Sequence, residues 1–156
     1  MFRRHPILTA VTVAYLGLVG VLTLSPVPEQ GRDSIIWRLV KIFERYPMTL
    51  WLDFATVEFL ANVAMFVPLG LFFVLLLGRG RWWLAILFGL VLTVAIEFVQ
   101  QFLPSRVSDP RDLVANSIGA TLGVLIALVV TAAKARRLKA QRRSPRTRPA
   151  PVVQSR

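Results

Sequence analysis

The sequence contains no cysteine, and its one histidine, His5, lies near the amino terminus. Without cysteine, neither a disulfide framework nor a thiolate metal site can form, and the redox state of the compartment cannot be read from the chain. Charged residues make up only 17% of the sequence, so most of it is too apolar for intrinsic disorder. These scarcities exclude a disulfide-rich scaffold, a cysteine-based zinc site and a chain that is unfolded throughout.

Apolar residues, in contrast, make up 55% of the 156 residues, and the mean hydropathy is +0.61. Runs that are almost free of charge cover residues 7–24, 59–77, 82–102 and 113–133. At about 1.5 Å per residue, each run is long enough to cross a hydrocarbon core of about 30 Å, with little or no tilt. The first run is longer than the apolar part of a signal peptide and lacks a small-residue cleavage site, so we expect it to remain as a span. The sequence predicts an all-α polytopic membrane protein with four transmembrane helices.

The longest connection, residues 25–57, contains an amphipathic segment at 34–46. Apolar residues recur at helical spacing on one side of this segment, and most of its charged residues fall on the other. With Trp37 included, the pattern predicts a helix that lies in the membrane interface between the first and second spans; a cap over a pocket is the alternative. Only residues 78–81 join the second and third runs, so these two spans should be antiparallel neighbours.

The formal net charge of +11 is concentrated at the carboxyl end of the chain. Residues 134–156 hold nine bases and no acids, whereas the rest of the chain holds ten bases and eight acids. If the amino terminus is inside, all the acids fall in outer segments or near the outer ends of spans, as the positive-inside rule favours. We therefore expect both termini to be cytoplasmic, a membrane domain over residues 1–133, and a basic disordered tail over 134–156. The tail should bind anionic lipids of the inner leaflet and no nucleic acid.

Acidic and amide side chains interrupt the second, third and fourth spans only in the halves that this topology places outside. A carboxylate within a span costs roughly 2.5–3.5 kcal/mol on insertion scales, so Glu97 is expected to have a specific role. In each span the polar residues are three or four positions apart, as Glu58 and Asn62 are, and therefore share one helix face. We predict a ligand-binding pocket that opens to the outer side. Its residues are Glu58, Asn62, Glu97, Gln100, Arg106, Asp109, Asp112 and Asn116.

Each group of these residues also has a structural interpretation. Arg106, Asp109 and Asp112 either bind an anionic head group or form an internal salt bridge that fixes the turn. Glu97 either accepts a proton or contacts a ligand, or it forms a hydrogen-bonded strut between helices. The asparagines of the second and fourth spans are expected to join helices more than to bind a ligand.

A row of small residues follows one face of the fourth span: Ala115, Gly119 and Gly123. Small residues at this spacing let two helix backbones approach closely. We expect the row to pack against a neighbouring helix. A homo-oligomer formed through the same three residues is the other possibility.

Two motifs in these spans resemble those of VanZ-like membrane proteins. The first is Glu58-x-x-x-Asn62 followed by Phe66-Val67-Pro68-Leu69-Gly70, with glutamate where the family commonly has aspartate. The second is Glu97-x-x-Gln100, then Arg106-x-x-Asp109-x-x-Asp112-x-x-x-Asn116-x-x-Gly119-x-x-x-Gly123. Together with their flanking spans, the motifs cover about residues 53–128.

The resemblance implies a multi-pass protein of the bacterial cell membrane. The family's namesake gives Gram-positive bacteria resistance to the glycopeptide teicoplanin without altering the peptidoglycan precursor. By this resemblance we expect a non-enzymatic envelope protein whose pocket binds a lipid-linked precursor or a glycopeptide. Membrane lipids are the other expected partners, and no cofactor is expected.

A membrane enzyme is the alternative function. The carboxylates of the same pocket would act on a lipid phosphate or an isoprenoid, with Glu97 or an aspartate as the base. A divalent ion could then be held by Glu58, Asp109 and Asp112. A small transporter is a third possibility, which four spans would support only in an oligomer. No serine or cysteine nucleophile is paired with a histidine, which favours binding over catalysis.

Overall fold

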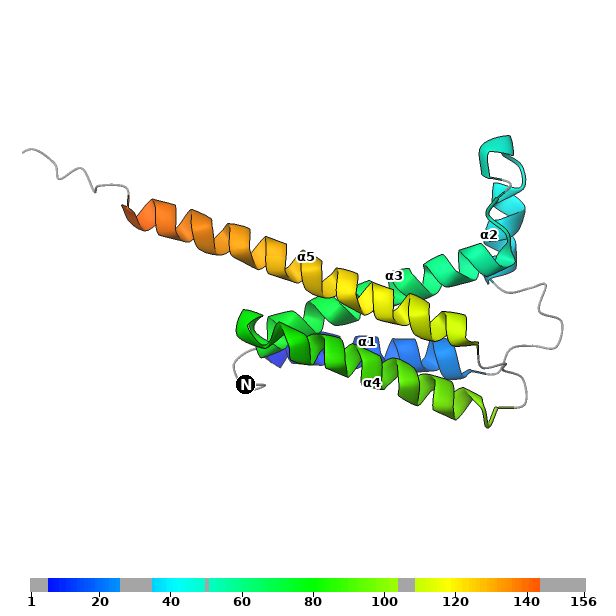
Figure 1. Ribbon diagram of the computed structural model, residues 1–156, viewed down its shortest axis with the longest axis horizontal. Coiled ribbons are helices and arrows are strands. Elements are labelled where there is room, and N and C mark those ends of the chain that lie inside the picture. Colours follow the sequence, from blue (N-terminus) through cyan, green and yellow to red (C-terminus); the bar gives the residue numbers. More distant parts are fainter. Residues whose placement is uncertain (1–5, 26–34, 50, 104–108, 144–156) are drawn as a thin grey trace, which may run out of the picture.

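The computed structural model describes residues 6–25, 35–49, 51–103 and 109–143, and all the regular structure in these ranges is helical. The long helices are α1 (Pro6–Leu24), α3 (Phe54–Leu77), α4 (Trp82–Gln100) and α5 (Pro110–Arg143). All of them are long and apolar enough to cross a membrane. α1 and α4 run in one direction and α3 and α5 in the other, so they form an antiparallel bundle (Figure 1). The predicted all-α fold with four membrane-length helices is confirmed.

The amphipathic segment also folds as predicted, into helix α2 (Ile35–Phe43), which is followed by the 3-10 helix η3 (Pro47–Thr49). α2 lies beside the beginning of α3 (Figure 1). Its Val40 is buried, and the rings of Trp37 and Phe54 pack with centroids 5.2 Å apart. Leu39 and Ile42 on the same helix are exposed. Whether these exposed side chains enter a membrane interface stays a prediction.

Helix α3 begins five residues before the predicted apolar run, and the cause is a capping residue. The side chain of Asp53 accepts a hydrogen bond from the backbone N–H of Thr56 at 2.8 Å, which satisfies one of the free donors at the helix start. The helix then continues through Pro68, whose ring disturbs the carbonyls one turn earlier. The Tyr15 hydroxyl of α1 donates to the carbonyl of Met65, three residues before Pro68, at 3.0 Å. This bond connects α1 to α3 at the proline.

Helix α5 is longer than predicted. It has 34 residues, or about 51 Å at helical rise, compared with about 30 Å of hydrocarbon. Its carboxyl end therefore extends past the other helices (Figure 1). The prediction of a disordered tail from residue 134 is wrong for residues 134–143, which continue the helix. These residues are mainly Ala, Leu, Lys, Arg and Gln, which are strong helix formers, and they extend a helix that is already nucleated. Residues 144–156 of the predicted tail lie outside the described part.

The closest helix pair is α3 and α5, because small residues line their contact. A Cβ atom added at Gly119 or Gly123 would collide with a backbone carbonyl of α3, and one added at Gly70 would collide with the carbonyl of Ala120. Ala115 is also completely buried. The predicted row of small residues therefore packs inside the chain, so these residues are not available for contact with a second copy. The possibility of an oligomer formed through them is wrong.

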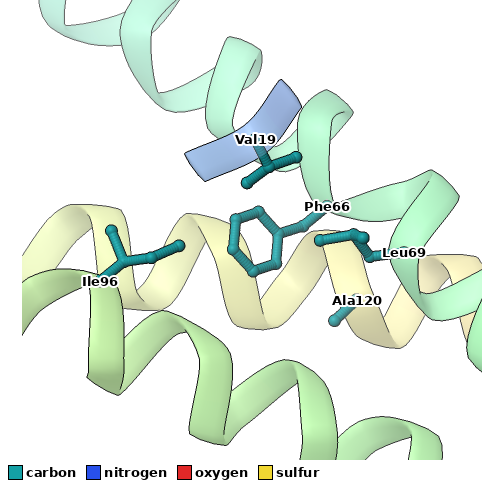
Figure 2. Close-up of a cluster of buried hydrophobic side chains, with 5 residues drawn as sticks. All are labelled: Val19, Phe66, Leu69, Ile96 and Ala120. Atoms are coloured by element: carbon teal, nitrogen blue, oxygen red, sulfur yellow. The ribbon is translucent and has the colours of Figure 1, made fainter. Parts of the chain in front are cut away.

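The core lies where all four long helices meet. Figure 2 shows its members, with the Phe66 ring in the middle of the cluster: Val19, Phe66, Leu69, Ile96 and Ala120. The outer faces of the long helices carry many exposed Leu, Val, Ile and Phe side chains. In lipid, helices with such faces associate through close packing and interhelical hydrogen bonds rather than through the hydrophobic effect. The polar contacts between the helices are therefore important for the stability of the bundle.

Candidate ligand site

A buried polar stripe runs along α4 and consists of Thr93, Glu97 and Gln100. Their spacing places them on one face of the helix over about 10 Å. Only 0%, 7% and 5% of their respective surfaces are exposed, so the stripe faces the neighbouring helices and not lipid. Gln101, the next residue, is exposed and does not belong to the stripe.

Gln100 joins the end of α4 to the end of α1. Its side-chain amide nitrogen donates to the backbone carbonyl of Thr23 at 2.9 Å. The last carbonyls of a helix have no partner within the helix, so this bond satisfies one that would otherwise be free. The Thr23 hydroxyl donates to the carbonyl of Val19 at 2.8 Å. It therefore does not compete with the Thr23 carbonyl for the amide of Gln100.

Asn116 joins α5 to the deepest member of the stripe. Its amide nitrogen donates to the Thr93 hydroxyl at 2.9 Å, and both side chains are buried. Thr93 and Asn116 lie about 10 Å inside their helices, counted from the ends where α4 stops and α5 begins. This bond matches the structural interpretation of Asn116, that of a connection between helices.

Asn62 joins α3 to α5. Its amide nitrogen donates to a carboxylate oxygen of Asp112 at 2.7 Å in a partly buried contact. Asp112 lies in the first turn of α5, where a negative charge interacts favourably with the helix dipole. Asn62 lies further from the start of α3 than Asp112 lies from the start of α5. Because the two side chains meet, the start of α3 lies about 9 Å further out along the bundle than the start of α5. The predicted polar faces of the two helices thus meet, displaced by nearly two turns.

Asp109 has a local structural role in the described chain. Its side chain accepts a hydrogen bond from the backbone N–H of Arg111 at 2.8 Å, and its carbonyl accepts from the N–H of Asp112 at 2.9 Å. Asp109 therefore caps α5, and Pro110 occupies the first helical position, where its missing donor is not needed. Neither of the two roles considered for Asp109, head-group binding or an internal salt bridge, is needed to explain its position.

The remaining predicted residues are Glu58 and Arg106. Glu58 is half-buried on α3, one turn before Asn62, and it interacts within the chain. Arg106 lies outside the described residues. Within residues 6–25, 35–49, 51–103 and 109–143, no three acids or histidines are close enough to hold a metal ion. Glu58, Asp109 and Asp112 therefore do not form the divalent-ion site considered for the enzyme alternative.

In the described part of the chain, the side-chain oxygens Gln100 Oε1 and Asn116 Oδ1 are buried and accept no hydrogen bond. The amide of Gln100 cannot be reversed, because its nitrogen must donate to a carbonyl. The oxygen and nitrogen of the Asn116 amide could be exchanged, because the Thr93 hydroxyl can either donate or accept. In either orientation, one of the two amide atoms would still lack a partner. Leaving such a group without a partner costs about 1–3 kcal/mol, which calls for an explanation beyond helix packing.

The sequence interpretation missed the two threonines that complete these contacts, Thr23 and Thr93. A threonine within an apolar helix usually bonds to its own backbone, as Thr12 does to the carbonyl of Leu8. The available signal was spacing: Thr93 lies one turn before Glu97 and extends the same polar face. No comparable signal pointed to Thr23, because Gln100 contacts its backbone and not its side chain.

A comparison with protein families matched residues 12–131 to the family described as VanZ/LLP1. No curated protein and no solved structure matched the chain. The matched residues make up well over half of the 156 and include the α4 stripe, its contacts with α1 and α5, and the bond between α3 and α5. The chain is therefore a multi-pass membrane protein that belongs to the VanZ/LLP1 family.

Proposed function

We propose that this protein binds a lipid-linked saccharide or a glycopeptide at the polar residues between α3, α4 and α5, without cleaving it. The observation that carries the proposal is the pair of buried acceptors, Gln100 Oε1 and Asn116 Oδ1, which have no donor. A ligand that supplies O–H or N–H groups would satisfy both. Because an unmet buried acceptor is costly, even one such bond favours binding.

The chemistry of the site indicates which ligands fit. Glu97 and Asp112 carry carboxylates, and the free atoms of Gln100 and Asn116 are carbonyl oxygens, so the site is rich in acceptors. The α4 stripe spreads them over about 10 Å, longer than one sugar ring. Sugar hydroxyls and peptide N–H groups are donors distributed over such a length. These properties suit a saccharide or a glycopeptide better than a bare phosphate.

The position of the site suits a ligand that comes from one membrane surface. Gln100 is the last residue of α4, and Glu97 lies about 5 Å inside that end. A head group could reach both residues without crossing the hydrocarbon core. Both free oxygens are closed off from solvent, so entry requires the adjoining ends of α4 and α5 to part. The proposal places this end on the outer side of the cell membrane.

An enzyme acting on a lipid phosphate or an isoprenoid remains the second candidate, and the burial of Glu97 is the observation that favours it. Only 7% of this residue is exposed, and buried carboxylates often serve as bases. Without the three-acid set, this candidate depends on Glu97 alone. Incubation of purified protein with the ligand separates the two functions, because binding alone returns the ligand unchanged.

The test in cells uses Glu97→Gln and Arg106→Ala. We expect both variants to reach the membrane at the wild-type level and to lose protection against teicoplanin. Glu44→Gln is the matched control, because Glu44 is exposed just after α2 and outside the site. If both site variants insert normally and protect as well as the wild type, the polar residues are structural and the proposal is wrong.

A further inference from the structure

A groove with a volume of about 360 Å³ lies where α3 and α5 begin. Its lining residues are Asp53, Ala55, Thr56, Phe59 and Arg111. None of them belongs to the polar site of the proposed function. The groove combines one acid and one base at its rim with apolar carbon from Ala55 and Phe59.

The acid of the groove is held in the ionised form. Hydrogen bonds from Thr56 lower the pKa of the Asp53 carboxyl, and the charge of Arg111 lowers it further. The bond from the Thr56 backbone also fixes the direction of one carboxylate oxygen at 2.8 Å. Asp53 is therefore a negative group of defined position at neutral pH.

The base of the groove is anchored through its backbone. The N–H of Arg111 donates to Asp109 in the cap of α5, while the Arg111 side chain is exposed. Arg111 and Asp53 attract each other across the groove, but no hydrogen bond or ion pair joins their side chains. Two opposite charges thus face the same open space.

The level of the groove matches that of lipid head groups. Asp53 immediately precedes the apolar span of α3, and Arg111 is the second residue of the span of α5. Because α3 begins further out than α5, the Arg111 backbone lies about 12 Å deeper than that of Asp53. Phe59 follows Asp53 by six residues, which places it about 9 Å deeper in the membrane at helical rise. The groove therefore extends from the polar boundary of the membrane to the first carbons of the acyl chains.

We propose that this groove binds one phospholipid whose head group carries both a phosphate and a primary ammonium, as in phosphatidylethanolamine. The Arg111 guanidinium would hold the phosphate, for which its planar set of donors is suited. The ammonium would donate to Asp53, and the glycerol and first acyl carbons would lie against Phe59. An anionic head group without an ammonium would be repelled by Asp53. A choline head group has no N–H to donate.

The test measures lipid retention by the purified full chain with native mass spectrometry. The protein is supplied with equal amounts of phosphatidylethanolamine, phosphatidylglycerol and phosphatidylcholine. Charge pairs at exposed sites are weak, so we expect a roughly two- to fivefold preference for phosphatidylethanolamine. Asp53→Asn and Arg111→Gln should each remove this preference. Asn is itself a good capping residue, so Asp53→Asn keeps the start of α3 intact.

The control is Arg79→Gln, which removes an exposed arginine at the opposite end of the bundle, in the 3-10 helix η4 (Arg79–Arg81), and should keep the preference. Equal retention of the three lipids, a preference for phosphatidylglycerol, or wild-type selectivity in both groove variants would overturn the proposal. A second readout is the increase in thermal midpoint when phosphatidylethanolamine is added. If Asp53 and Arg111 only stabilise the fold, their variants lower the midpoint in lipid-free detergent and leave this increase unchanged, which also overturns the proposal.

Discussion

At the scale of single residues, Gln100 and Asn116 are buried amides that each leave one polar atom without a hydrogen-bond partner. Each donates one short bond to another helix, at 2.9 Å in both cases. Each nevertheless keeps one buried oxygen without a donor. Burial of an amide whose oxygen accepts no bond weakens the bundle, and a purely structural strut could avoid this cost. This remaining capacity is what the proposed ligand would use.

Asp53 gives a residue-scale prediction about acid. Its pKa in the folded protein is below the ordinary value of 3.8, mainly because of hydrogen bonds from Thr56. The ionised carboxylate therefore stabilises the folded state above pH 3.8, and this contribution is lost as the pH falls through the lower, folded pKa. We expect the thermal midpoint of the wild type to fall more steeply below pH 3.8 than that of Asp53→Asn, whose amide caps the helix but does not titrate. Parallel midpoint curves for the two proteins would contradict this account.

At the scale of helices, the contact between α3 and α5 sets the register of the polar residues. Gly119 and Gly123 bring α5 against backbone carbonyls of α3, and the bond between Asn62 and Asp112 forms above them on the same pair of helices. A shift of one turn along this contact would move Asn62 away from Asp112 by about 5 Å. The small residues therefore position the polar ones.

Gly123→Ala tests this contact. The added methyl group would overlap the backbone of α3, which cannot move as a flexible side chain can, so we expect a loss of about 1–3 kcal/mol in the free energy of unfolding. The matched change is Gly20→Ala in α1, where the new methyl group meets nothing within 4 Å and the helix gains about 0.5–1 kcal/mol. Unfolding of both variants in detergent measures the difference. Equal unfolding midpoints would show that the close approach is not required.

The sequence predicts the helices well and their contacts less well. The apolar runs locate all four membrane-length helices, because a span needs only length and hydropathy. The boundaries depend on local chemistry: Asp53 moves the start of α3 outward, and the strong helix formers after residue 133 carry α5 past the expected end. The partners Thr23 and Thr93 depend on the relative depth of two helices. Spacing within α4 can place Thr93 on the polar face of its own helix, but it cannot identify the residue of another helix that pairs with it.

At the scale of the whole molecule, the two ends of the bundle differ in chemistry. One end has η4 with Arg79 and Arg81, and the basic part of α5 extends in the same direction (Figure 1). The other end has α2, the capped starts of α3 and α5, and the polar stripe of α4 (Figure 1). The positive-inside rule then predicts that the polar site faces the outside of the cell.

This orientation can be measured directly, because the chain has no cysteine that would add background. Gln101→Cys places a thiol at the exposed end of α4, and Gly80→Cys places one in η4, where an added Cβ meets nothing within 4 Å. A maleimide that cannot cross membranes should label Gln101→Cys on intact cells. It should label Gly80→Cys only after the cells are permeabilised. The opposite pattern would place the polar site in the cytoplasm.

The most direct test of the central claim, that the unmet acceptors bind a ligand, compares Asn116→Leu with Thr93→Val. Both changes break the bond between α4 and α5, but only Asn116→Leu removes the spare oxygen. The measurement is the affinity of each purified variant in lipid nanodiscs for teicoplanin and for a lipid-linked saccharide. We predict that both variants lose thermal stability. Asn116→Leu should also lose about tenfold in affinity for one of the probes, the value of one buried hydrogen bond, while Thr93→Val should bind it as the wild type does. Equal affinities in the two variants, or a wild-type protein that binds neither probe, would contradict the account.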